Sequence, residues 1–437
     1  MVPETLPGSA TPAFGNSLLD RPPRRTAGPG TAATVPLAGA IAVYGLTMAF
    51  QGTSQSLFLA NAVHATPALI GAYFTARAAA GIVVNQAAGW LSDRVRDRRV
   101  LLAVAGAGGA IGTVTLAGVH DYVVVLVTGM VFLSIGGITF GQLFAYANTF
   151  AVAGGRDVTA FSAVMRAVFS AAWVVGPPLG LFLLAGLGFR SFYLVVACLS
   201  LVSAVVGRWG LPPVAAPASV RHGHKERGHK ESGHQRHEHK RRASGARWKV
   251  PALPARLWLL LAVVLVLGIV NQMYFIDIPL HVTKDTGHGP QLVGWMAGVT
   301  AAAEIPVMII AGRIAHRVGP GRIVGASAVA GMALYAVLPF AASVPTLLAM
   351  AALNGVYQGV SLSIPMVMVQ DEAPGGPGSS SALYTSAFGV AGMLAGAVTG
   401  AVTTAVGYGD LFWVCAALSG CAAVLMAARA SLARARP

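Results

Sequence analysis

The chain has 437 residues, of which 55% are hydrophobic and only 10% charged, and its formal net charge is +15. This composition excludes a soluble multidomain protein and indicates a polytopic membrane protein. Of the 30 lysines and arginines, 26 fall in tails and loops on one side of the predicted spans, which places that side and both termini in the cytoplasm. The positive charge therefore reports topology, and no basic patch with interleaved aromatic residues suggests nucleic acid as a partner.

The first half of the chain begins with a polar segment and continues with six apolar stretches. Residues 1–33 are rich in Pro, Gly, Thr and Ala and contain no apolar signal-peptide region, so they predict a disordered cytoplasmic tail. Each apolar stretch can cross a bilayer, for which about 20 helical residues suffice. We expect an N-terminal six-helix bundle over residues 34–207, with spans at 35–61, 68–92, 100–118, 122–149, 158–186 and 190–207.

A basic segment at residues 208–255 separates the two halves. Six of the eleven histidines lie between residues 222 and 240. Histidine-rich tracts can bind zinc or nickel weakly, but this one has no apolar residue that would fix ligand geometry. We therefore interpret it as a solvated cytoplasmic linker, and we expect neither a metal site nor a cofactor.

The second half repeats the plan of the first. Six more apolar stretches form a C-terminal six-helix bundle over residues 256–430, followed by a short cytoplasmic tail at 431–437. The sequence thus predicts an all-α polytopic membrane protein with twelve transmembrane helices in two bundles. The second set of spans is 256–282, 291–315, 322–342, 346–370, 379–404 and 408–430.

An internal repeat indicates that the two bundles are pseudo-symmetric. A gapless shift of 223 positions aligns Pro67 and Gly71 with Pro290 and Gly294, and it aligns residues 89–95 with residues 312–318. Matches between apolar residues arise by chance in membrane helices, whereas matched Pro, Gly and Arg positions do not arise so easily. Two homologous membrane halves would leave such a repeat.

The loop at residues 89–99 carries a cluster of charge between two apolar spans. Gly89, Leu91, Asp93 and Arg94, followed by basic residues, resemble the motif between helices 2 and 3 of the major facilitator superfamily. The resemblance implies the major facilitator fold and a gating role for this loop on the cytoplasmic face. Its expected gating residues are Gly89, Asp93, Arg94, Arg98 and, in the second copy, Arg317.

The expected role of Asp93 can be tested by mutation. In the superfamily such an aspartate lies near the start of helix 11, where a helix N-terminus attracts negative charge. We predict that Asp93→Asn weakens closure of the cytoplasmic side and leaves substrate binding intact.

Four charged residues fall within the predicted spans, where each costs about 2.5 to 3.5 kcal/mol on insertion scales. Glu304 lies in the middle of its span, and burial favours its protonated form, so it is a candidate proton carrier. Its alternative role is a structural carboxyl paired with a buried cation. Asp277 is either a second proton site or a gate contact, and Arg77 and Arg166 of the first half could pair with these acids as latches.

Uncharged polar residues cluster in the spans that line the central cavity in the superfamily. Amides offer donors and acceptors that match sugar hydroxyls, and an indole can stack on the apolar face of a sugar. Hydrogen bonding between helices is the alternative role for each single residue. The candidate substrate-binding residues are Gln51, Gln55, Gln142, Tyr146, Asn148, Trp173, Asn271, Gln272, Tyr274, Asn354, Tyr357 and Gln358.

A motif in the fifth span narrows the resemblance. Residues 176–180 read Gly-Pro-Pro-Leu-Gly, and this pattern, together with residues 155–167, 271–279 and 303–312, resembles the sugar efflux transporter family of the superfamily. The resemblance implies a monomeric, proton-driven antiporter that exports sugars or small glycosides across the bacterial inner membrane. A multidrug/proton antiporter and a non-transporting membrane sensor that uses the His-rich linker are the alternatives. We do not expect an enzyme.

Overall fold

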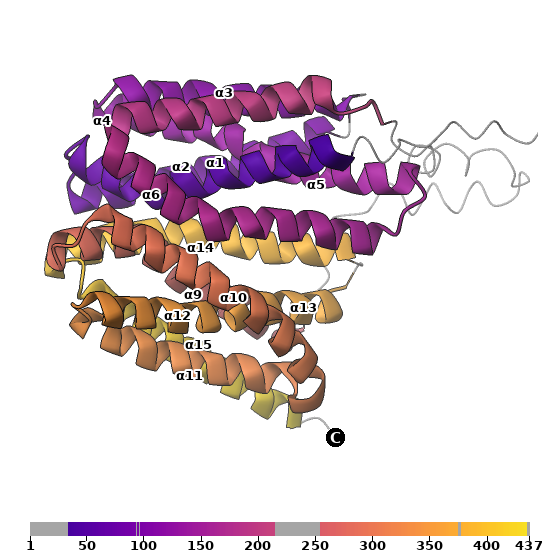
Figure 1. Cartoon of the computed structure of the whole chain (residues 1–437). Helices are drawn as coiled ribbons and strands as arrows, with labels where there is room; N and C mark the ends of the chain where they lie inside the picture. Colours follow the sequence, from indigo (N-terminus) through magenta and orange to yellow (C-terminus); the bar gives the residue numbers. More distant parts are fainter. Residues whose placement is uncertain (1–33, 93, 96, 215–253, 375–376, 435–437) are drawn as a thin grey trace, which may run out of the picture.

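The structure is a computed structural model that describes residues 34–92, 94–95, 97–214, 254–374 and 377–434 (Figure 1). The predicted N-terminal tail and the His-rich tract lie outside these residues. Helices of the first half are α1 (Thr34–Asn61), α2 (Pro67–Ser92), α3 (Arg98–Gly118), α4 (Tyr122–Thr128), η2 (Gly129–Leu133), α5 (Ser134–Ala153), α6 (Val158–Val205) and η3 (Val206–Gly210). Those of the second half are α9 (Ala255–Leu280), η5 (His281–Asp285), α10 (Pro290–Val318), α11 (Pro320–Val337), η6 (Leu338–Phe340), α12 (Val344–Ser361), α13 (Ser363–Glu372), α14 (Pro377–Val406) and α15 (Leu411–Arg434).

The predicted twelve crossings correspond, within the described residues, to eleven helical stretches that are long and apolar enough to span a membrane. The longest stretch, residues 160–210, is interrupted at Gly188, whose backbone has φ 70° and ψ 171°. Only glycine adopts this conformation without strain. The chain turns back at this residue, so the stretch supplies the fifth and sixth crossings, and the all-α fold with twelve spans is confirmed.

The internal repeat of the sequence is also a repeat of structure. Helices α2 and α10 begin at Pro67 and Pro290, the two prolines that the shift of 223 positions aligns. Proline suits the first turn of a helix because its φ angle is already helical. Its missing backbone N–H is no loss there, since N–H groups of the first turn have no partner within the helix. After short turns, α3 and α11 begin at Arg98 and Pro320. Equivalent sequence signals thus start equivalent helices in the two halves.

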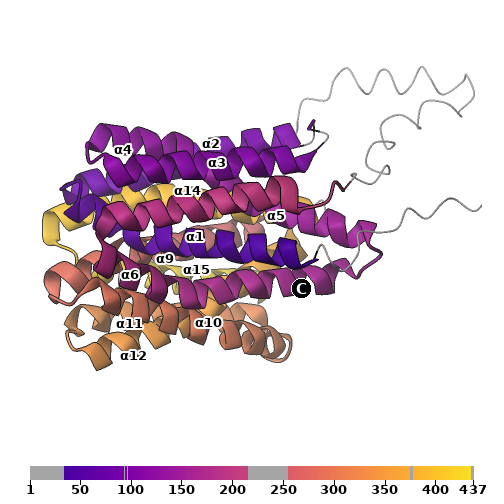
Figure 2. The ribbon, with the colours of Figure 1, turned by 45° about the horizontal axis from the view of Figure 1, so that its top comes forward.

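The two halves lie side by side, with the first half in indigo to magenta and the second in orange to yellow (Figures 1 and 2). The start of α1 and the end of α15 lie at the same end of the bundle. Helix α15 continues to Arg434, beyond the predicted boundary at residue 430, because Ala, Leu and Arg are strong helix formers.

At one end of the molecule, α2 and α14 pack backbone to backbone. A Cβ atom added at Gly71 would lie 2.5 Å from the Gly396 carbonyl oxygen, and one added at Gly396 would lie 2.6 Å from the Thr75 amide nitrogen. The Thr75 hydroxyl donates a hydrogen bond to the Met393 carbonyl across the same contact, at 3.1 Å. Small residues four apart let membrane helices approach this closely. We call this the closed end.

A second contact between the halves joins α6 and α10 near the same end. Cβ atoms added at Gly294 and Gly298 would lie 3.0 and 2.8 Å from atoms of Pro178. At the opposite end of α2 and α10, Cβ atoms added at Gly89 and Gly312 would meet nothing within 4 Å. Trp90, beside Gly89, is 59% exposed. Both glycines therefore lie in open space at the end where α1 begins, which we call the open end.

Candidate substrate cavity between the two halves

A cavity of about 260 Å³ lies where the halves meet. Helices α1, α6, α9, α10 and α12 contribute to its wall, so residues of both halves face one space. Its lining residues are Thr53, Phe169, Ser170, Trp173, Tyr274, Phe275, Ile278, Pro279, Val293, Met296, Ala297, Thr300, Ala301, Glu304, Ile305, Met308, Gln358 and Leu362. Most of this surface is apolar, with a few polar groups at separated points, as is usual for sites that bind small molecules.

Three of the residues predicted to bind substrate line this cavity: Trp173, Tyr274 and Gln358. The Trp173 indole makes an edge-to-face contact with Phe275, with ring centroids 6.2 Å apart, and so joins α6 to α9 across the two halves. Gln358 is 2% exposed, and its Nε2 atom has no hydrogen-bond partner. The Gln358 amide can therefore donate a hydrogen bond to a ligand in the cavity.

Glu304 also lines the cavity, from the middle of α10. No ion pair or hydrogen bond joins it to another side chain in the part of the chain that the structure describes. Pro306 follows two residues later inside the same helix and leaves a backbone carbonyl without its usual donor. A lone carboxyl in a mostly apolar cavity is stable in its protonated form and can take up or release a proton when water reaches it.

Asp277, the other predicted intramembrane acid, lies on α9 and is fully buried. Neither of its carboxyl oxygens has a hydrogen-bond partner. The next residues, Ile278 and Pro279, line the cavity, but Asp277 does not. The two acids therefore lie in different environments, one facing the cavity and the other packed within the second half.

The latches predicted between Arg77 or Arg166 and the two acids are not among the ion pairs of the described residues. Arg77 donates from Nη1 to the Gln55 side-chain oxygen at 3.3 Å, and the Gln55 amide donates to the Tyr73 hydroxyl at 2.9 Å. The Arg166 guanidinium lies over the ring of Phe144, 5.8 Å from its centroid. In this conformation both arginines interact within the first half.

The other predicted polar residues lie outside the lining of the main cavity. Gln51 lines a smaller pocket that also contains Arg77. Ser92 donates a hydrogen bond to Gln142, Ser162 donates to Asn148, and Tyr335 donates to Asn354. Asn271 and Tyr357 are buried, each with a polar atom that has no partner, and Gln272 lies against Gly392 of α14. Three of these residues, Gln142, Asn148 and Asn354, therefore connect helices to one another.

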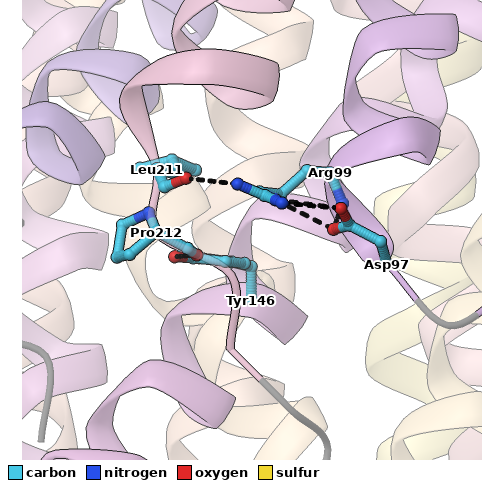
Figure 3. A network of polar contacts seen from close by, with 5 residues as sticks. All are labelled: Asp97, Arg99, Tyr146, Leu211 and Pro212. Carbon is cyan, nitrogen blue, oxygen red and sulfur yellow. Dashed lines mark hydrogen bonds and ion pairs between the residues drawn. The ribbon is translucent and has the colours of Figure 1, made fainter.

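Tyr146 belongs to a network at the open end of the first half (Figure 3). Its hydroxyl donates to the Pro212 carbonyl at 2.7 Å, and Arg99 donates to the neighbouring Leu211 carbonyl at 3.0 Å. Arg99 also pairs with Asp97, the N-cap of α3, at 2.8 Å, and this contact lowers the pKa of the Asp97 carboxyl. The network fixes the backbone where the chain leaves the first half for the linker.

The predicted gating loop is described only in part. Asp93 lies outside the described residues, so its proposed role stays a prediction. The Arg94 guanidinium lies 3.3 Å from the ring centroid of Trp90, a cation–π contact. Arg98 is the first residue of α3, and Arg317 is exposed near the end of α10. Arg94, Arg98 and Arg317 lie at the open end.

Several cavity residues have no distinctive signal in the sequence. Thr53, Ser170 and Thr300 supply hydroxyl groups to the lining. Serine and threonine are common in membrane helices, where they usually bond to the backbone of their own helix, so they attract no notice. The aromatic and sulfur-containing wall residues Phe169, Phe275, Met296 and Met308 also resemble ordinary apolar span residues.

Comparisons with known proteins agree with the resemblance seen in the sequence. The family profile of the Major Facilitator Superfamily matches residues 37–289 and 260–436. The chain is 32% identical to Sugar efflux transporter B of Salmonella typhimurium over 371 residues, covering 84% of this chain and 88% of that protein. It is 32% identical to Sugar efflux transporter A of Escherichia coli over 391 residues, covering 88% and 92%.

Solved structures with the same fold are more distant in sequence. The crystal structure of the nucleoside transporter NupG has a TM-score of 0.70 at 15% identity, with 91% of this chain and 98% of that chain covered. The D-xylose-proton symporter has a TM-score of 0.69 at 14% identity, with 90% and 96% covered. These likenesses show a shared fold.

Proposed function

Because the chain belongs to the major facilitator superfamily and, within it, to the sugar efflux transporter family, we propose that it exports sugars or small glycosides in exchange for protons. The observation that carries this proposal is the cavity between the halves, in which an unpaired carboxyl faces a stacking surface and a free amide. Alternating access would expose this cavity first to one side of the membrane and then to the other.

The cavity fits a small polyhydroxylated ligand with one apolar face. Its volume of about 260 Å³ is just below the range of about 300 to 1,000 Å³ that is usual for ligand sites. The Gln358 Nε2 atom would donate to a hydroxyl of the ligand, and Trp173 would lie against the apolar face of its ring. The hydroxyls of Thr53 and Thr300 donate to the Ala49 and Ala351 carbonyls and would accept hydrogen bonds from other ligand hydroxyls. Satisfying a buried donor in this way favours binding.

The distribution of charge supports an orientation. The open end carries the starts of α1 and α3 and the basic residues near the ends of α10 and α15, and the sequence places these basic loops in the cytoplasm. In this orientation the open end would face the cytoplasm, and the closed end would face the outside of a bacterial inner membrane. A sugar would enter the cavity from the cytoplasm in this state.

Glu304 supplies the coupling in the proposed cycle. In the inward-open state it releases its proton to the cytoplasm, and the sugar then binds in the adjacent part of the cavity. The halves rock about the contacts at the closed end, the sugar leaves to the outside, and an external proton reloads the carboxyl before the return. Loading of the carboxyl removes the cost of burying a charge during the return step.

The experiment is transport by purified protein in liposomes, with a panel of sugars and an imposed pH gradient. Glu304→Gln keeps the size of the side chain and cannot release a proton. We expect this variant to lose gradient-driven efflux and to keep counterflow exchange of labelled sugar, because exchange needs no net proton movement. Unchanged gradient-driven efflux in Glu304→Gln would contradict the assignment.

The matched control is Asp410→Asn, which neutralises an exposed acid in the turn before α15. We expect it to retain both activities. Loss of efflux in the control as well would mean that net charge, and not the cavity carboxyl, sets the rate.

The apolar wall supports one second candidate, a multidrug/proton antiporter. Phe169, Phe275, Met296 and Met308 would suit an amphipathic drug, since aromatic and thioether side chains adapt to varied apolar shapes. Competition between a fluorescent amphipathic cation and the sugar panel for the purified protein separates the two functions. Displacement of the dye by sugars favours sugar export, whereas tight dye binding that no sugar affects favours drug export.

A further inference from the structure

Three titratable residues form a row along one face of the helix at the closed end of the second half. Asp277 lies near the end of α9, His281 begins the π-helical turn η5, and Asp285 ends it. The His281 Nδ1 atom lies 2.9 Å from an Asp285 carboxyl oxygen, and the same oxygen accepts the Gly409 amide at 2.9 Å. The row runs from the surface inward, because the side chain of Asp285 is 38% exposed and that of His281 only 3%.

The inner part of the row has polar atoms without partners. The His281 Nε2 atom and both Asp277 carboxyl oxygens are buried with no hydrogen-bond partner. Side chains four apart on a helix have Cβ atoms about 5 to 6 Å apart, within reach of a direct or water-mediated hydrogen bond. The Phe412 ring packs edge to face against His281, at a centroid distance of 5.3 Å. The unpaired Asp277 oxygens therefore lie one helical turn from a histidine that is bonded to the partly exposed Asp285.

The helices packed around Asp277 bring no cation to pair with it in the described part of the chain. Tyr408, in the turn before α15, and Cys415, on α15, are the titratable groups that face it from neighbouring elements. Helix α14 contributes only Tyr384 as a titratable side chain, and its hydroxyl bonds to the Leu362 carbonyl. A carboxyl in these surroundings is stable when protonated and not when ionised.

We propose that Asp277 is a proton-binding site that is loaded from the closed end of the transporter through Asp285 and His281. The Asp285 carboxylate takes a proton from outer water and passes it to His281 Nδ1, while His281 Nε2 gives its own proton to the Asp277 carboxylate. One proton enters, one reaches Asp277, and the histidine stays neutral throughout. The reverse transfer returns the proton to outer water.

This site adds an external pH sensor to the proposed antiport cycle, and its sidedness rests on the orientation proposed above. Asp277 is fully buried while the closed end is closed, so proton uptake there stabilises the closed outer side. The following residues, Ile278 and Pro279, line the substrate cavity. Protonation of Asp277 thus acts on the same helical turn that contacts the substrate. Glu304, on the cavity side, has no part in this transfer.

The experiment follows the proton on Asp277 by infrared spectroscopy of the full-length protein in a lipid film at neutral pH. We expect a carbonyl stretching band of a protonated carboxyl that is absent in Asp277→Asn and present in Glu304→Gln. When H₂O is exchanged for D₂O, this band shifts in the wild type. In His281→Gln and Asp285→Asn the shift should be slower by about tenfold or more, the rate effect of losing one hydrogen-bonded partner.

The matched control is His288→Gln, a second histidine at the closed end, which bonds to the Ala342 carbonyl and lies outside the row. It should exchange at the wild-type rate. If His281→Gln does not fold, Asp285→Asn still provides the test, because Asp285 is partly exposed and its replacement disturbs the packing less. Absence of an Asp277-dependent band, or wild-type exchange in Asp285→Asn, would overturn the proposal. Neither readout uses a sugar or a gradient, so failure here leaves the test of efflux through Glu304 unaffected.

Discussion

Polar residues in the membrane-spanning helices divide into those with partners inside one half and those without. Gln55 and Tyr146 have their hydrogen bonds satisfied, the first by Arg77 and Tyr73 and the second by Pro212. Gln358 has an unpaired donor beside the cavity. Leaving a buried polar group unpaired costs about 1 to 3 kcal/mol. An unpaired donor that lines a cavity is therefore the group that a ligand can satisfy, and residues with complete bonds hold the bundle together.

This division predicts the effect of Gln358→Leu, which removes the unpaired donor and keeps the approximate size of the side chain. We expect sugar affinity to fall about tenfold, the effect of losing one hydrogen bond of about 1.4 kcal/mol. The protein itself should be as stable as the wild type, because no internal bond is lost. Titration calorimetry with the best sugar of the panel measures the change.

The control for this prediction is Asn148→Leu. Asn148 is also an amide on a cavity-lining span of the superfamily, but it accepts a hydrogen bond from Ser162 and does not line the cavity. Its replacement should leave sugar affinity within experimental error of the wild type. Equal losses in the two variants would mean that the sugar binds elsewhere.

Among the elements, the helices themselves and their repeat could be predicted from the sequence, whereas the directions of their side chains could not. Long apolar stretches bounded by Pro, Gly and charged residues define spans, and Pro67 and Pro290 start matching helices in both halves. Membrane helices are apolar on nearly every face, so hydropathy carries little information about rotation around the axis. For this reason Gln358 and Trp173 reach the cavity, while Gln142 and Asn148 from a span of the same expected kind do not.

The contact between α2 and α14 predicts how the closed end can be forced apart. Gly400 approaches Gly71 so closely that a larger side chain cannot fit without separating the helices. We expect Gly400→Leu to shift the protein toward the state in which this end is open. Spin labels at exposed Asp121 and Asp410, one in each half at the closed end, should then lie farther apart by double electron–electron resonance.

Gly141→Leu provides the control for this element. Gly141 lies on exposed surface of α5, and a Cβ atom added there meets nothing within 4 Å. It should leave the distance between the labels unchanged. A wild-type distance in Gly400→Leu would show that the helices do not separate at this contact during transport.

At the scale of the whole molecule, the two halves are joined directly by their helices as well as by the linker. The α2–α14 and α6–α10 contacts hold the closed end, and the Tyr146 and Arg99 network fixes the chain at residues 211–212, before the linker begins to cross. Alternating access needs the halves to rock about such contacts and needs the linker only to be long enough. The transport mechanism therefore assigns no chemistry to the His-rich tract, whereas a sensor would depend on it.

Deletion of residues 222–240 distinguishes these two functions. It leaves 20 of the 39 residues between Val214 and Pro254, and about 20 extended residues reach about 66 to 72 Å, more than twice the thickness of a bilayer core. We expect sugar flux in liposomes to stay within about twofold of the wild type, because shortening a flexible connection by half changes its closure free energy by only about 0.6 kcal/mol.

A matched variant that replaces the same 19 residues with a Gly/Ser sequence of equal length should behave like the wild type. Loss of flux in both variants would assign an essential role to the histidines, and loss in the deletion alone would show that length limits the rocking of the halves.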